Sequence, residues 1–89
     1  NEFSEIADYI LAHHERWDGK GYPKGLKGLE IPYLSRIICV VDSYDAMTRD
    51  RAYRKAMTVD YALKELKDNA GIQFDPEIVS VFLARPDIR

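Results

Sequence analysis

The sequence contains a single cysteine, Cys39, which excludes an internal disulfide framework and suits a reducing compartment. Long apolar runs are also missing, because the longest, residues 37–41, has five residues against the roughly twenty of a membrane span. No signal-peptide pattern is present. The 13 basic and 15 acidic residues nearly balance, so no overall field attracts nucleic acid or a membrane surface. These absences predict a cytoplasmic protein that neither binds DNA nor inserts into a membrane.

The remaining composition is that of a small globular protein. Of the 89 residues, 46% are hydrophobic and 31% are charged, which argues against disorder. A chain of this length makes at most one domain, with a thin core. It begins with Asn1 rather than Met, so we expect a piece of a longer protein.

The first half of the chain has two segments with helical patterns and no strand alternation. Residues 3–14 place their apolar side chains on one arc, which His13 and His14 continue, so we expect both histidines on the buried face of this helix. A second helix is predicted from Pro32 to about Met47. Its run at residues 37–41 is apolar on every side, so this helix should be central and fully packed.

The second half of the chain has two further helices with recognisable ends. Thr58 is the predicted N-cap of a helix that runs to about Asn69 and is stopped by Gly71. Asp75 is the predicted N-cap of the last helix, with Pro76 at its first position. Four apolar residues of this helix should face inward before Arg85-Pro86 ends it: Ile78, Val79, Phe82 and Leu83.

A long loop rich in glycine and lysine separates the first two helices. Residues 17–28 contain four of the five glycines together with Lys20, Lys24 and Lys27. Backbone amides of such loops can bind phosphate, although an ordinary solvated loop explains the same residues. The predicted fold is therefore all-α, with about four helices and this loop between the first two.

Two features point to metal ligation. Adjacent helical residues such as His13 and His14 point about 100° apart, so they could serve two neighbouring ions, or one could ligate while the other holds a second group. Two hydrogen-bonded histidines at a helix end are the alternative. Asp42 follows an apolar run, where a buried carboxylate costs several kcal/mol unless it is paired or binds a metal. The alternative there is an ion pair with Arg36 or Arg49.

Two arginines follow the second helix. Arg51 and Arg54 are three residues apart, with Tyr53 between them. One guanidinium group can bind two phosphate oxygens, and an aromatic ring can stack on a base. An ordinary charged connection is the alternative.

Longer motifs carry a resemblance to a known family. HHERWDGKGYPKGLKGLEIP, then SRIICVVDSYDAMTRDRAYRKA and then GIQFDPEIVSVF are similar to the HD-GYP family of the HD phosphohydrolase superfamily, from about Ile10 to Phe82. The resemblance implies part of a larger HD-type helical domain from a bacterium. It also implies hydrolysis of the cyclic dinucleotide c-di-GMP at a cluster of two or three divalent metal ions, often iron or manganese.

The same resemblance implies two groups of site residues. The metal ligands are His13, His14 and Asp42. The residues that bind substrate are Gly21, Tyr22, Pro23, Arg51 and Arg54.

Two departures from the family pattern shape the expectation. Ala52 stands where the family usually has proline between the first arginine and the tyrosine. The adjacent His-Asp pair, a further upstream histidine and a neighbouring lysine are absent from the chain, so residues 1–89 should be the C-terminal part of the domain, without a complete catalytic site. The alternative is a divergent, non-catalytic module that binds dinucleotide or a protein partner through the Gly-Tyr-Pro loop. Exposed apolar faces could also support a homodimer.

Overall fold

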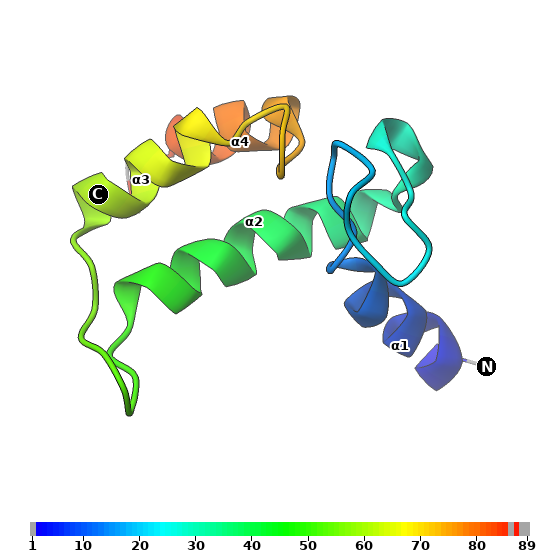
Figure 1. Ribbon diagram of the computed structural model, residues 1–89, viewed down its shortest axis with the longest axis horizontal. Coiled ribbons are helices and arrows are strands. Elements are labelled where there is room, and N and C mark those ends of the chain that lie inside the picture. Colours follow the sequence, from blue (N-terminus) through cyan, green and yellow to red (C-terminus); the bar gives the residue numbers. More distant parts are fainter. Residues whose placement is uncertain (1, 86, 88–89) are drawn as a thin grey trace.

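The computed structural model describes residues 2–85 and 87, and within them every regular element is helical. The elements are α1 (Glu2–Ala12), the short 3₁₀ helix η1 (Gly28–Glu30), α2 (Tyr33–Thr48), α3 (Val59–Asp68) and α4 (Pro76–Leu83) (Figure 1). The prediction of an all-α fold with four helices and a long loop between the first two is confirmed. η1 was not predicted, because a single three-residue turn leaves no periodicity in the sequence.

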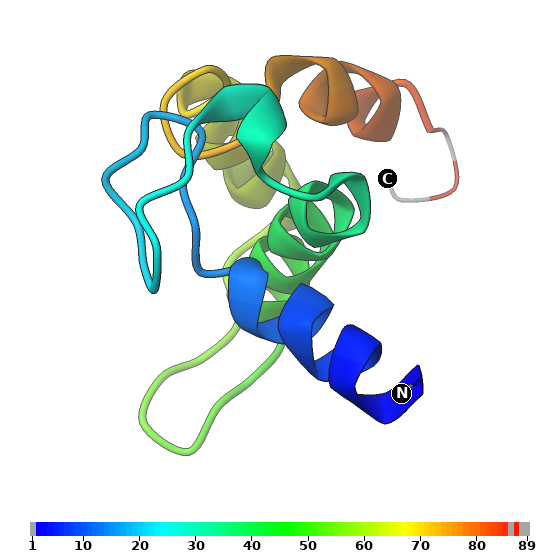
Figure 2. The same ribbon diagram turned by 90° about the vertical axis from the view of Figure 1, so that its right-hand side faces the viewer.

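The long helix α2 organises the molecule. It contacts all three other helices, and α3 also contacts α4. α1 lies on one side of α2, while α3 and α4 lie together on the other side (Figures 1 and 2). The core sits on this second side, where Val40 packs with Leu66, Phe74 and Val79. Among the described residues, no helix is both long and apolar enough to cross a membrane.

The predicted caps of α3 and α4 are confirmed. The Thr58 side chain accepts a hydrogen bond from the amide of Tyr61 at the start of α3, and Gly71 follows that helix with a φ of +83°. The Asp75 carboxylate accepts from the amides of the second and third residues of α4. Such caps stabilise a helix by about 1 kcal/mol. Val79 is buried, and Ile78, Phe82 and Leu83 pack against the core as predicted. The helix ends at Leu83; Pro86 lies outside the described residues.

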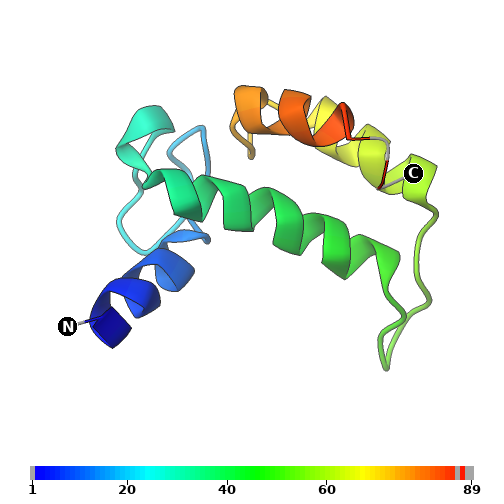
Figure 3. The same ribbon diagram turned by 180° about the vertical axis from the view of Figure 1, so that it is seen from behind.

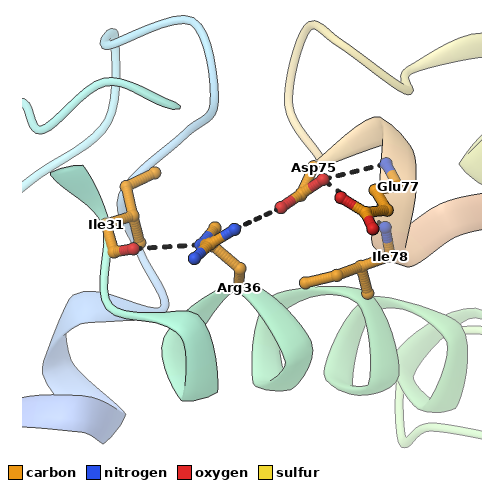
Figure 4. A network of polar contacts seen from close by, with 5 residues as sticks. All are labelled: Ile31, Arg36, Asp75, Glu77 and Ile78. Carbon is orange, nitrogen blue, oxygen red and sulfur yellow. Dashed lines mark hydrogen bonds and ion pairs between the residues drawn. The ribbon is translucent and has the colours of Figure 1, made fainter. Parts of the chain in front are cut away.

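Asp75 also joins α4 to α2. Its carboxylate lies 2.6 Å from Nη1 of Arg36, whose Nε donates to the carbonyl of Ile31 (Figure 4). The two side chains are only 13% and 3% exposed. Removing one partner of a buried ion pair costs about 3–5 kcal/mol, so this contact fixes α4 against the start of α2.

Two expectations about burial are wrong. α1, all of whose residues are described, buries none of them, and Ile6 and Ile10 are 53% and 52% exposed. α2 is central but not fully packed, since Val41 is half exposed. Helical periodicity identifies the apolar face of a helix, but it does not say which neighbour covers that face. Among the described residues, α2 and the glycine loop lie against α1, which otherwise projects from the molecule (Figure 3).

Candidate functional site

The histidine pair lies in the turn that follows α1 rather than on the helix itself. α1 ends at Ala12, and the amides of His13 and His14 donate to the carbonyls of Ile10 and Leu11. His13 is half-buried and His14 is exposed, so the expectation that both continue a buried stripe is wrong. The turn brings the His13 ring toward Asp42 of α2, and the centroids of the two histidine rings are 4.0 Å apart.

His13 faces Asp42 of α2. The distance between Nε2 of His13 and Oδ2 of Asp42 is 3.8 Å. Nδ1 of His13 is hydrogen-bonded to the carbonyl of Ile10; a carbonyl can only accept, so Nδ1 carries a proton. In the neutral ring, the Nε2 lone pair therefore faces a carboxylate. Two acceptors opposed in this way are stabilised by a cation between them.

Asp42 is not a buried carboxylate. Its side chain is 65% exposed, because it emerges from α2 toward the histidine turn rather than toward the core. The alternative ion pairs are also wrong, since Arg36 is bound to Asp75 and Arg49 to Asp45.

His14 is joined to the Gly-Tyr-Pro loop. The hydroxyl of Tyr22 lies 3.3 Å from Nδ1 of His14, and the two rings stack with centroids 4.8 Å apart. The backbone repeats the contact, because the amide of Tyr22 donates to the carbonyl of His14. The loop and the histidine turn therefore form one unit.

These side chains share one pocket of about 310 Å³. Its lining includes His13, His14, Tyr22 and Asp42, together with Cys39 and Gln73. The structure thus brings the three predicted metal ligands to one cavity. Within the part of the chain that the structure describes, no three His, Cys, Asp or Glu side chains are placed to hold a metal ion together. His13 and Asp42 are a pair of donors, and His14 lies beside them.

The sequence analysis missed Glu15, which holds the glycine loop in place. This carboxylate is 2% exposed and accepts hydrogen bonds from the amides of Lys24 at 2.7 Å and Leu26 at 2.8 Å. The backbone of Trp17 and Asp18 also donates to the carbonyls of residues 72 and 73. The position of Glu15 directly after the histidine pair could have drawn attention to it. Its role could not be predicted, because its partners are backbone amides, which no side-chain motif reveals.

Gly21 is required by a close approach of two backbones. A Cβ atom at this position would lie 2.5 Å from the amide nitrogen of Arg16 and 2.5 Å from the carbonyl oxygen of His14. No side chain fits there without moving the main chain. Pro23 follows in the exposed part of the loop.

Cys39 lines the pocket one turn before Asp42. Burial, and then the charge of Asp42, raise the pKa of its thiol to about 11, although Arg16 acts in the opposite direction. The thiol is therefore protonated at neutral pH, whereas ligation of a metal requires the thiolate.

The two predicted substrate arginines lie apart from this pocket. Arg51 and Arg54 close a tight turn through a pair of backbone hydrogen bonds beyond the end of α2 (Figure 3). Nη2 of Arg54 donates to the carbonyl of Ala46 at 2.8 Å, whereas Arg51 is exposed. The end of α2 lies about 9 Å along the helix axis from Asp42, at 1.5 Å per residue. Asp42 thus lies on α2, and the arginine turn follows the C-terminal end of the same helix.

The comparison with protein families identifies this arrangement. A family model described as HD domain matches residues 1–78. The chain belongs to the HD domain family. The resemblance drawn from its motifs is thereby confirmed, and the histidine turn, the glycine loop and α2 with Asp42 all lie inside the matched part of this HD domain.

Similar proteins are cyclic dinucleotide phosphodiesterases. The chain is 46% identical over 77 residues to a cyclic di-GMP phosphodiesterase of Thermotoga maritima, covering 86% of this chain and 21% of the relative. It is 44% identical over 75 residues to the 3'3'-cGAMP-specific phosphodiesterase 3 of Vibrio cholerae, covering 84% of this chain and 16% of the relative. The crystal structure of a cyclic GMP-AMP specific phosphodiesterase from V. cholerae matches with a TM-score of 0.72 and 29% identity, covering 93% of this chain and 19% of that chain. The chain thus spans about a fifth of the length of such relatives.

Proposed function

We propose that this HD domain chain is the C-terminal part of an HD-GYP domain that hydrolyses c-di-GMP in cytoplasmic bacterial signalling. The observation that carries the proposal is the meeting of His13, His14 and Asp42 at one pocket beneath the Gly-Tyr-Pro loop. Similarity to proteins named as cyclic di-GMP phosphodiesterases supports it.

The donor set suits a divalent metal ion. Imidazole nitrogen and carboxylate oxygen are ligands that iron and manganese accept. Two ligands bonded at about 2.1 Å to one ion can be at most about 4.2 Å apart, and His13 Nε2 and Asp42 Oδ2 are 3.8 Å apart. A bound ion of this kind acts as a Lewis acid toward a phosphodiester. His13 and Asp42 would hold it, with His14 beside them, and further ligands would come from elsewhere in the longer protein.

The chain's own cations would bind the substrate. Arg51 and Arg54 lie in the turn that follows α2, where the exposed Arg51 and the half-buried Arg54 could contact phosphate oxygens or guanine. The loop with Gly21, Tyr22 and Pro23 borders the metal pocket and adds the exposed Lys20 and Lys24. The dinucleotide would then lie along the part of α2 between the metal pocket and the arginine turn.

The choice of substrate within its class rests on small differences. Relatives named for cyclic di-GMP are 46% and 45% identical to this chain, and one named for 3'3'-cGAMP is 44% identical. Cyclic dinucleotide hydrolysis is the coarser proposal, and c-di-GMP is the finer one. Assays with both substrates distinguish them.

A non-catalytic module is the second candidate. It is favoured by the finding that no three potential ligands in residues 2–85 and 87 are placed to hold a metal together. Such a module would bind dinucleotide, or a protein partner through the exposed Gly-Tyr-Pro loop, without turnover.

Alanine substitutions in a longer protein that carries this chain test the proposal. We expect His13→Ala, His14→Ala and Asp42→Ala each to lower the bound metal and to abolish hydrolysis while the helical circular dichroism remains. Asp45→Ala is the matched control, because Asp45 lies on the same helix, pairs with Arg49 and is not part of the pocket lining. Wild-type metal content in all three variants would overturn the assignment. If the wild-type protein binds the dinucleotide but does not hydrolyse it, the result would favour the non-catalytic module.

A further inference from the structure

Tyr22 makes a specific contact with one member of the histidine pair. Its hydroxyl lies 3.3 Å from Nδ1 of His14, and its ring stacks on the imidazole at 4.8 Å with an interplanar angle of 12°. Together the stack and the polar contact restrict the position of the imidazole and the direction in which its Nδ1 points.

Gly21 places Tyr22 where it can make this contact. A Cβ atom on Gly21 would lie 2.5 Å from backbone atoms of His14 and Arg16, so only glycine lets the loop approach this closely. The amide of Tyr22 then donates to the carbonyl of His14. Backbone and side chain of the loop thus bind the same residue.

The two histidines are held in the same way by different partners. Nδ1 of His13 is hydrogen-bonded to the carbonyl of Ile10, and Nδ1 of His14 to the hydroxyl of Tyr22. In each ring, Nε2 is the remaining nitrogen. A cation on Nε2 of His14 requires the proton to be on Nδ1, where the Tyr22 oxygen can accept it.

We infer that Tyr22 is a positioning residue for His14: its hydroxyl holds Nδ1 and leaves Nε2 as the nitrogen available to a divalent cation. The role of the Gly-Tyr-Pro loop thus includes orienting a metal ligand, beyond forming a wall of the substrate site. The functional meaning of this inference rests on the proposed function. Outer partners of metal-bound histidines typically affect metal affinity by 10–100-fold.

Tyr22→Phe tests the contact without metal or substrate. The variant keeps the aromatic stack and the backbone bond and loses only the hydroxyl. We expect the ¹⁵N ring shifts of His14, measured above the usual histidine pKa of about 6.5, to move toward those of an unconstrained histidine, while those of His13 stay in place. Tyr61→Phe on α3 is the matched control and should change neither histidine. Wild-type His14 shifts in Tyr22→Phe would overturn the inference.

Metal titration then separates positioning from substrate contact. In the longer protein, we expect Tyr22→Phe to weaken Mn²⁺ binding by about tenfold, as measured by electron paramagnetic resonance of the free ion. Unchanged Mn²⁺ affinity with weaker c-di-GMP binding would overturn the inference and leave Tyr22 as a substrate contact. Because the shift measurement needs no turnover, failure of the proposed hydrolysis leaves this result intact.

Discussion

At the scale of single residues, the candidate site is defined by which side-chain atoms of its residues already have hydrogen-bond partners within the chain. Nδ1 of each histidine has a partner within the chain. Nε2 is therefore the ring nitrogen that remains for a ligand, and both histidines line the same pocket. Asp42 contributes an exposed carboxylate, and Nε2 of His13 lies 3.8 Å from its Oδ2. If the proposed metal binds here, the turn after α1 and helix α2 position its ligands without forming a closed site among the described residues.

The reactivity of the Cys39 thiol is a measure of the electrostatic environment of this pocket. Its pKa of about 11 leaves about one thiol in ten thousand ionised at pH 7, compared with a few per cent for a free cysteine. The greater nucleophilicity of a high-pKa thiolate offsets part of the difference. We therefore expect iodoacetamide to alkylate the folded chain at least about tenfold more slowly than the urea-unfolded chain at pH 7, with the rate rising toward pH 11.

Asp42→Asn is the informative variant for this measurement. The negative charge of Asp42 raises the pKa of Cys39, so its removal should lower that pKa and speed alkylation at neutral pH. Asp45→Asn, farther along α2, is the control. Equal alkylation rates in the folded and unfolded wild-type chains would contradict the environment described for the thiol.

At the scale of elements, α2 carries the site along its length. Asp42 lies in its middle, and the turn with Arg51 and Arg54 follows its C-terminal end (Figure 1). The glycine loop is attached to the segment after α1 through Glu15, and to the α3–α4 connection through backbone hydrogen bonds. Any change that tilts α2 therefore moves the candidate metal pocket and the arginine turn together.

The same elements show what the sequence could and could not predict. The ends of α3 and α4 were predictable, because capping by Thr58 and Asp75 depends on residues two or three positions away. The exposure of Asp42 and the end of α1 before His13 were not, because they depend on contacts between distant segments. Likewise, the ion pair of Arg36 with Asp75 spans 39 residues, and nothing local distinguishes it from a pair with Asp42.

The arginine turn gives a prediction in which the two residues differ. We expect Arg51→Ala and Arg54→Ala each to weaken c-di-GMP binding in the longer protein by about 1.5–3 kcal/mol, the usual value of a hydrogen bond to a charged group. Arg54→Ala should also lower the free energy of unfolding by about 0.5–1.5 kcal/mol, because it loses the bond to the Ala46 carbonyl.

Calorimetry and urea unfolding measure these two effects separately. Lys67→Ala on α3 removes the same charge away from the turn and serves as the control for general electrostatics. If neither arginine variant changes dinucleotide affinity, the turn has no part in the substrate site. If Arg51→Ala alone destabilises the fold, the hydrogen bond of Arg54 is not the one that matters.

At the scale of the whole molecule, the chain exposes more surface than its size requires. Its accessible area is 6212 Å², whereas a compact protein of 10.3 kDa exposes about 5,400 Å². The excess is close to the roughly 800 Å² that one partner buries in a standard interface. The exposed surface includes the large apolar side chains of Phe3, Ile6 and Ile10 on α1. Further parts of a longer protein, or a second copy of the chain, would cover such a face.

We expect the isolated 89 residues not to hydrolyse c-di-GMP. A two-metal site must hold its ions about 3.5–4 Å apart, with enough ligands on each, and no three potential ligands among the described residues are placed to hold one ion. The purified chain, given Mn²⁺ or Fe²⁺ under reducing conditions, should show no product by chromatography, and metal binding should be weak. In sedimentation it should self-associate, and Ile6→Asp with Ile10→Asp should reduce this. Turnover near that of a longer phosphodiesterase would mean that His13, His14 and Asp42 suffice, and that the site is complete within this chain.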